Sequence, residues 1–144
     1  MKTVNSEQEM LDYGRALATT LSAGDILCLE GELGAGKTTL AKGIATGLGV
    51  KNNITSPTFS LLNVYETGET PKKRGIKSLV HIDTYRLKDE AELTEIGVAD
   101  YLGQADTVCI VEWPEKVTAL LAGKKVKTIK IEHIEENKRK ITVS

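Results

Sequence analysis

One eight-residue segment limits what this chain can fold into more than any other. Residues 31–38 read Gly-Glu-Leu-Gly-Ala-Gly-Lys-Thr and match the pattern G-x-x-x-x-G-K-T. The mainly apolar run 25–30 before it is typical of a strand, and the residues after it have the spacing of a helix that ends at Gly49. A glycine-rich loop between a strand and a helix is the context in which this pattern binds phosphate, so an ordinary glycine turn is the weaker interpretation.

Each residue type in this segment suits a phosphate ligand. Glycines at 31, 34 and 36 let backbone N–H groups turn inward and remove side chains that would obstruct a close approach. The start of the helix adds unpaired N–H groups and a favourable dipole. Lys37 offers a positive charge to the terminal phosphates, and the Thr38 hydroxyl suits Mg²⁺, which prefers hard oxygen ligands. We therefore expect the chain to bind a nucleoside triphosphate together with Mg²⁺.

The composition fits one domain that spans residues 1–144. Nineteen basic and twenty acidic residues give a net charge of -1, which argues against nucleic acid as the main ligand. No apolar run approaches the roughly 20 residues of a membrane span, and the first residues lack the apolar core of a signal peptide. Cys28 and Cys109 lie in apolar runs, where buried, reduced thiols are expected. We therefore expect a cytoplasmic protein.

Helical and strand patterns alternate along the rest of the chain. Ser6 and Glu9 have the spacing of a capping box at the start of a first helix. Further strands are expected at 59–65, 79–83 and 108–111, further helices at 90–96, 98–102 and 115–121, and a terminal antiparallel hairpin at 126–133 and 139–143. This order predicts an α/β fold of the P-loop NTPase type, with a mostly parallel central sheet flanked by helices and with antiparallel additions that include the C-terminal hairpin.

Two carboxylates follow expected strands and could complete the site. Hydrolysis at a loop of this kind needs an acidic residue at the end of a neighbouring buried strand. Glu112 follows four uninterrupted apolar residues, and Asp83 follows a run that His81 interrupts. Parallel strands would bring both acids to the edge where the phosphate loop lies, although either could be an ordinary surface acid. We expect Glu112 to be the metal ligand, Asp83 to orient the attacking water or reach the metal through water, and His81 to pack rather than bind metal.

A polar break after the loop helix is a candidate switch. Residues 56–58 read Ser-Pro-Thr, and Ser56 or Thr58 could sense the γ-phosphate unless the segment is a rigid turn. The basic run 72–74 is expected at a solvated hairpin tip. Arg86 could contact phosphate, but a structural ion pair is an equal alternative.

Four motifs together resemble one family, the TsaE (YjeE) family. They are Gly-Glu-Leu-Gly-Ala-Gly-Lys-Thr-Thr at 31–39, Ser-Pro-Thr-Phe at 56–59, His-Ile-Asp-Thr-Tyr-Arg-Leu at 81–87 and Val-Glu-Trp-Pro at 111–114. The resemblance covers nearly the whole chain from Glu7 to Glu115, and the Lys-rich insertion 69–77 departs from the family pattern. Members of this family are small bacterial ATPases needed to make the tRNA modification N6-threonylcarbamoyladenosine (t6A).

The resemblance implies an ATPase that depends on partners. Family members bind the TsaD–TsaB pair, in which TsaD carries the transfer chemistry, so tRNA is met only through the complex. Carried onto this sequence, Lys37, Asp83 and Glu112 are catalytic, and Thr38 and Glu112 ligate Mg²⁺. The residues implied to contact ATP or ADP are Glu7, Gly34, Ala35, Gly36, Lys37, Thr38 and Thr39, with Glu7 beside the adenine or ribose.

Other functions fit the sequence less well. A stand-alone small-molecule kinase usually has a basic lid, but Arg86 and Arg139 are the only arginines after residue 84. A GTPase would need a strand before the D-x-x-G match at 100–103 and an N-K-x-D element, and neither is found. A nucleotide-sensing module would bind ATP without hydrolysing it even with partners. Because no arginine finger is evident in the chain, we expect weak ATPase activity in isolation and stimulation by partners.

Overall fold

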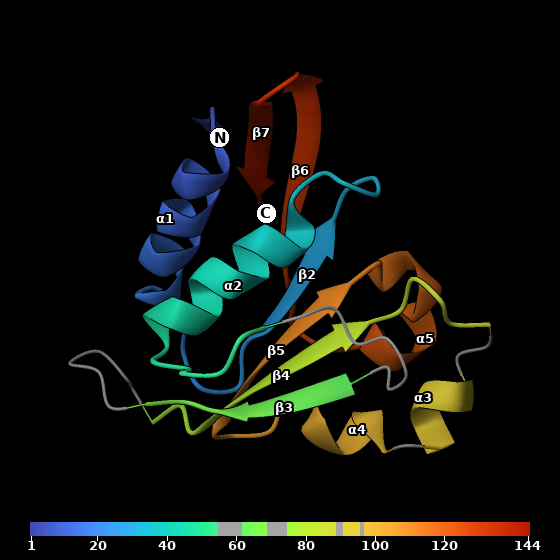
Figure 1. Ribbon diagram of the computed structural model, residues 1–144. Coiled ribbons are helices and arrows are strands. Elements are labelled where there is room, and N and C mark those ends of the chain that lie inside the picture. Colours follow the sequence, from blue (N-terminus) through green and yellow to red (C-terminus); the bar gives the residue numbers. More distant parts are fainter. Residues whose placement is uncertain (55–61, 69–74, 89–90, 96) are drawn as a thin grey trace.

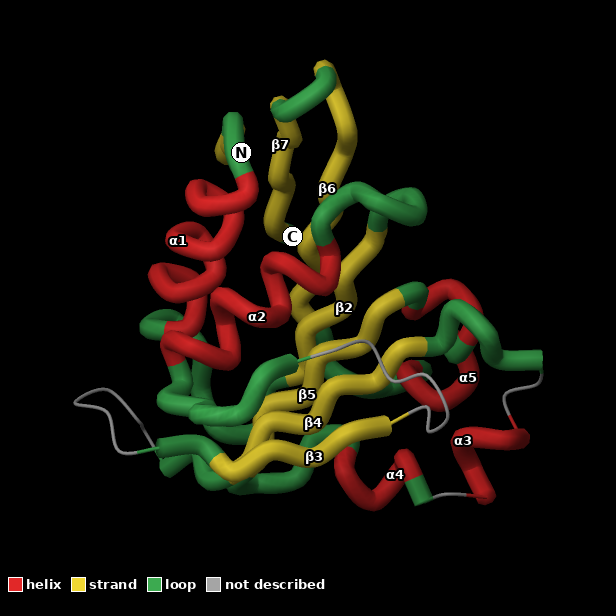
Figure 2. The backbone as a smooth tube through the Cα atoms, in the orientation of Figure 1, coloured by secondary structure: helices red, strands yellow, loops and turns green. Residues whose placement is uncertain are grey.

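The computed structural model describes residues 1–54, 62–68, 75–88, 91–95 and 97–144, which form a seven-stranded sheet with helices packed on it (Figures 1 and 2). The strands are β1 Lys2–Val4, β2 Ile26–Glu30, β3 Leu62–Glu66, β4 Ser78–Asp83, β5 Thr107–Glu112, β6 Lys127–Glu135 and β7 Lys138–Val143. The helices are α1 Glu7–Ala18, α2 Lys37–Gly47, α3 Ala91–Glu95, α4 Val98–Tyr101 and α5 Thr118–Leu121, with a 3-10 turn, η1, at Pro114–Lys116. Across the sheet the strands lie in the order β1-β7-β6-β2-β5-β4-β3.

The centre of the sheet is parallel. β2 pairs in parallel with β5 and with β6, and β4 pairs in parallel with β5. The other three pairs, β1 with β7, β6 with β7 and β3 with β4, are antiparallel. The predicted α/β class, with a mostly parallel centre and antiparallel additions that include the C-terminal hairpin, is therefore confirmed. Since parallel strands end at the same edge, the residues after β2, β4 and β5 meet there.

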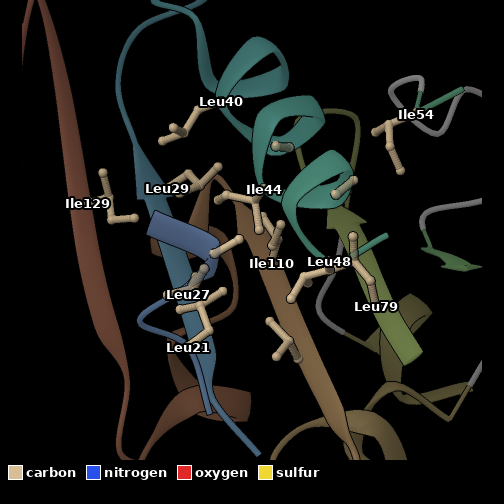
Figure 3. Packing of buried hydrophobic residues seen from close by; sticks show 14 of the residues in the cluster. Leu21, Leu27, Leu29, Leu40, Ile44, Leu48, Ile54, Leu79, Ile110 and Ile129 are labelled. Atoms are coloured by element: carbon tan, nitrogen blue, oxygen red, sulfur yellow. The ribbon is translucent and has the colours of Figure 1, made fainter. Parts of the chain in front are cut away.

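Side chains alternate across the central strands and make a core on each face of the sheet. Leu27 and Leu29 of β2 pack with Ile44 of α2 in the core under α1 and α2 (Figure 3). Cys28 lies between them in sequence but belongs to the opposite core, with residues of α3 and α4. All six residues of β5 are buried, which is the physical reason for its continuous apolar run. Figure 1 shows α1 and α2 side by side over the sheet.

Helix α1 begins at the predicted cap, with one difference in its hydrogen bonds. The Ser6 hydroxyl accepts the backbone N–H of Glu9 at 3.1 Å. The Glu9 carboxylate accepts the N–H of Asn5 at 3.2 Å, whereas a regular capping box would use the N–H of Ser6. The cap thus links the strand β1 to the first turn of α1.

Two local expectations need correction, one strand was not foreseen, and one expected strand is described only in part. β1 was not expected; it forms because Lys2 to Val4 pair with the edge of β7. The strand expected at 108–111 extends to Thr107–Glu112, so Glu112 lies within β5 and not after it. The helix expected at 115–121 is divided, because Val117 is buried in a non-helical conformation between η1 and α5. Residues 62–65 of the strand expected at 59–65 lie in β3, and residues 59–61 are outside the described ranges.

The predicted burial of the two thiols is confirmed. Cys28 and Cys109 are buried and free of disulfides. Across the described ranges, no helix has the length and apolar character needed to cross a bilayer.

Candidate nucleotide-binding site

The phosphate loop joins the end of β2 to the start of α2. Gly34 and Gly36 have φ angles of 81° and 110°, a region that side-chain-bearing residues rarely adopt. A side chain at Gly36 would also begin 3.1 Å from the Met10 side chain of α1. Backbone conformation therefore requires glycine at these two positions of the G-x-x-x-x-G-K-T segment.

Lys37 is the first residue of α2 and is only 5% exposed. Its Nζ donates to the backbone carbonyls of Gly31 and Glu32, the latter at 3.2 Å, and lies 3.5 Å from the ring centroid of Trp113. Burial lowers the pKa of this ammonium, and the charges of Glu112, Glu115 and Asp83 oppose that shift. Two backbone carbonyls of the loop and the face of the Trp113 ring thus hold the Lys37 ammonium in place.

Glu112 ends β5 as a buried carboxylate, 2% exposed, beside the helix that carries Thr38. The Thr38 hydroxyl lies 3.4 Å from each carboxylate oxygen of Glu112. His81 Nε2 lies 2.5 Å from Glu112 Oε2. The Thr84 hydroxyl donates to the backbone carbonyls of Glu112 at 3.0 Å and Trp113 at 2.6 Å, which holds the end of β5 against the chain after β4. The fold therefore brings together the two residues expected to ligate Mg²⁺.

Asp83 ends β4 directly beside Glu112 in the strand register. Its Oδ1 accepts the backbone N–H of Tyr85 at 3.0 Å. Burial is the main cause that raises the pKa of Asp83, and the nearby charge of Glu112 raises it further. The Tyr85 hydrogen bond and the nearby side chains of His81 and Lys37 act in the opposite direction and lower the pKa of Asp83. A carboxyl group with raised proton affinity at this edge suits proton acceptance or water orientation.

The oxygen donors at this edge fit Mg²⁺ by their chemistry. A hydroxyl and a carboxylate are hard ligands, and Mg²⁺ is usually held by one or two protein groups together with phosphate and water. Over the described parts of the chain, no group of three or more His, Cys, Asp or Glu side chains is arranged to hold a metal. The Thr38 hydroxyl and the Glu112 carboxylate thus fit a Mg²⁺ ion whose other ligands are phosphate and water.

A cavity of about 330 Å³ opens on the other side of the loop, beside the start of α1. It is lined by Ser6, Glu7, Met10, Gly34, Ala35, Gly36, Thr39, Asn137 and Arg139. Glu7, Ala35 and Thr39 were each expected to contact nucleotide, and the fold brings them to this one cavity. Asn137 and Arg139 come from the β6–β7 hairpin, and Arg139 Nε donates to the Ala35 carbonyl at 3.2 Å. The hairpin therefore forms one wall of the candidate site.

Comparisons with known proteins identify the family. Residues 4–141 match the family model for the threonylcarbamoyl adenosine biosynthesis protein TsaE. The chain belongs to the TsaE family. The resemblance inferred from four sequence motifs is thereby confirmed.

Individual relatives are similar to this protein over most of its length. The tRNA threonylcarbamoyladenosine biosynthesis protein TsaE of Bacillus subtilis is 38% identical over 142 residues, or 98% of this chain and 82% of the relative. The TsaE protein of Treponema pallidum is 37% identical, with 96% of both chains covered. The crystal structure of Bacillus subtilis YdiB matches with a TM-score of 0.72 and 31% identity, covering 99% of this chain and 82% of that one.

Trp113, beside the phosphate loop of this TsaE-family chain, has a left-handed backbone conformation. Its φ and ψ are 60° and 55°, and it is the one non-glycine residue with positive φ in the part of the chain that the structure describes. Such a conformation costs about 1–3 kcal/mol and is found mostly at functional sites. The ring lies against Lys37 and, at a centroid distance of 5.1 Å, against Tyr85. The strained backbone thus places the indole over the lysine of the phosphate loop.

Not every expected residue can be placed, and some were missed in the sequence. Ser56, Thr58 and the basic run 72–74 lie outside the described residues. Arg86 is exposed. The contact of Arg139 with the TsaE-family phosphate loop was not anticipated, because its position in an alternating strand carries no local sign of which loop it meets.

Proposed function

We propose that this chain binds ATP with Mg²⁺ and hydrolyses it, and that hydrolysis supports the t6A modification of tRNA. The observation that carries the proposal is the meeting of Lys37, Thr38, Glu112 and Asp83 at one edge of the sheet. Membership of the TsaE family supports the role in tRNA modification, as does the name that the Bacillus and Treponema relatives share.

The residues can be given chemical roles in hydrolysis. Water attacks the γ-phosphorus of ATP, the bond to the bridging oxygen breaks, and ADP and phosphate leave. Asp83 orients this water and is a candidate acceptor for its proton, and Lys37 with the loop amides stabilises charge on the phosphate oxygens. Thr38 and Glu112 would hold Mg²⁺, which when bound neutralises phosphate charge.

The nucleotide's sugar and base are assigned to the cavity beside α1. Glu7 at the first turn of α1 offers a carboxylate to hydroxyl or amine donors, and Gly36 and Thr39 border the same space. The opposite side of the loop then faces the strand-end carboxylates. This assignment orients ATP with its terminal phosphate toward Asp83.

Full activity is assigned to a complex with the TsaD–TsaB pair in the cytoplasm, where tRNA is met through that complex. Arg139 supports this view, because its Nε and one terminal nitrogen already donate to backbone carbonyls of Ala35 and of its own hairpin. A guanidinium held in this way is poorly suited to act as a mobile arginine finger.

The proposal is tested by measuring phosphate release from ATP with and without the TsaD–TsaB pair, with GTP as the control nucleotide. We expect slow release alone, a clear increase with the pair, and little release from GTP. Binding of ATP without hydrolysis in the complex would support a nucleotide sensor instead. Transfer of phosphate to an added small-molecule acceptor would support a kinase.

A further inference from the structure

His81 is a buried polar residue in a strand whose neighbouring residues are buried and apolar. It is 0% exposed and lies in β4 between Val80 and Ile82, which are equally buried. Alternation along the strand puts Leu79, His81 and Asp83 on one face. Leu79 belongs to the core under α2, so His81 occupies the next position between that core and the site.

Burial of this imidazole has a cost that packing does not explain. Among the described residues, His81 Nδ1 has no hydrogen-bond partner although it is fully buried. Leaving a buried polar atom unpaired costs about 1–3 kcal/mol, and a leucine or valine at this position would avoid that cost. A compensating role is therefore expected on the other side of the ring.

The other ring nitrogen makes one short, specific contact. Nε2 lies 2.5 Å from Oε2 of Glu112, on the neighbouring strand. With a proton on Nε2, the imidazole donates this hydrogen bond and the carboxylate oxygen accepts it. The contact holds Oε2 of Glu112 and leaves Oε1 without this partner, while the Thr38 hydroxyl lies 3.4 Å from both oxygens.

We propose that His81 is a positioning residue that fixes the rotation of the Glu112 carboxylate so that it can ligate Mg²⁺. The inference rests on the proposed function, in which Glu112 and Thr38 hold the metal. A carboxylate on a flexible side chain can turn about its last bond, and a donor behind it removes that freedom. Such partners of metal ligands typically change metal affinity by about 10–100-fold when they are removed.

The test compares nucleotide binding with and without metal, so it does not depend on catalysis. The dissociation constant of the non-hydrolysable analogue AMP-PNP is measured by calorimetry, once with Mg²⁺ and once with EDTA. The constant in EDTA divided by the constant in Mg²⁺ is the metal dependence. We expect His81→Leu to reduce this ratio by about 10–100-fold while the constant in EDTA stays within about twofold. We expect Glu112→Gln to reduce it similarly.

Two amide variants separate positioning from packing and cover the case in which His81→Leu does not fold. The side chain of His81→Gln is long enough to place its amide nitrogen where Nε2 lies. The side chain of His81→Asn is too short to do so. The proposal expects the metal dependence to be kept in His81→Gln and lost in His81→Asn. Equal ratios in both, or a ratio unchanged from the wild type in His81→Leu, would show a merely structural histidine and overturn it.

The wild-type ratio distinguishes failure of this inference from failure of the proposed metal site. If Mg²⁺ does not strengthen AMP-PNP binding in the wild type and Glu112→Gln changes nothing, the metal assignment fails and the inference fails with it. If the wild type and Glu112→Gln behave as expected but the His81 variants do not, only the role of His81 is wrong.

Discussion

At the scale of single residues, Lys37 shows how the loop holds a charge. Its ammonium is buried, and it contacts two loop carbonyls and the Trp113 ring. We expect Lys37→Ala to weaken ATP binding by about 10–100-fold, because a hydrogen bond to a charged group contributes about 1.5–3 kcal/mol. Titration of nucleotide against Trp113 fluorescence measures this. Lys42→Ala, an exposed change on the same helix, is the matched control, and equal affinity of the two variants would contradict the assignment.

Asp83 allows a prediction about pH and stability. Burial raises the pKa of this carboxyl above its ordinary value of 3.8 in the folded protein. The folded state therefore binds the proton more tightly, and stability falls as pH rises from the ordinary pKa through the raised one. Asp83→Asn removes that loss and keeps an oxygen for the Tyr85 N–H.

We expect Asp83→Asn to be more stable than the wild type at neutral pH and to lose ATP hydrolysis. The difference in the free energy of unfolding should shrink as pH falls below the raised pKa. Urea unfolding at several pH values checks the first claim, and phosphate release checks the second. A stability difference that grows toward low pH would show the opposite sign of the pKa shift.

At the scale of elements, the contact between α1 and α2 depends on glycines. A Cβ on Gly43 would lie 2.4 Å from the Leu11 carbonyl oxygen, and a Cβ on Gly14 would lie 2.7 Å from that of Leu40. Both neighbours are backbone atoms, which cannot rotate away. The two helices therefore approach so closely that even a methyl group has no room.

We expect Gly43→Ala to destabilise the protein. Alanine improves helix propensity by about 1 kcal/mol, but overpacking typically costs about 1–3 kcal/mol and forces the helices apart. Thermal unfolding should show a lower Tm for this variant, whereas Lys42→Ala on the exposed face should change Tm little. An increase in Tm for Gly43→Ala would mean that the helices separate at no cost.

Some elements were predictable and others were not. The phosphate loop, β2 and α2 carry strong local signals, since glycine positions and apolar spacing act within a few residues. β1 and the division at Val117 depend on partners elsewhere: the edge of β7 for β1 and the buried environment of Val117 for the break. Local propensity depends only on residues nearby in the sequence and carries no information about such partners, so these two features were missed.

At the scale of the whole molecule, Cys28 and Cys109 report on opening of the sheet. They lie on adjacent central strands in one core, and burial raises the pKa of each thiol to about 11. Only a thiolate reacts readily with disulfide reagents, so the native thiols should react slowly at pH 8. When the protein closes again faster than the reagent reacts, their labelling follows the fraction of molecules that are open.

We expect nucleotide with Mg²⁺ to slow that labelling. A ligand at 100 times its dissociation constant stabilises the folded state by about 2.7 kcal/mol, which corresponds to about 100-fold less open protein. Time courses with a chromogenic disulfide reagent measure the effect. The same nucleotide concentration should protect Lys37→Ala much less, and equal protection of both proteins would place the ligand elsewhere.

The sequence by itself determined the phosphate loop, the alternation of helices and strands, and the family, because these follow from residue types at short, regular spacing. Only the tertiary structure decided which distant groups meet. Thr38 and Glu112 are 74 positions apart, Arg139 and Ala35 are 104 apart, and His81 and Glu112 are 31 apart. Those meetings depend on strand order and register, which bring strand ends and a hairpin to one edge and which no local pattern encodes.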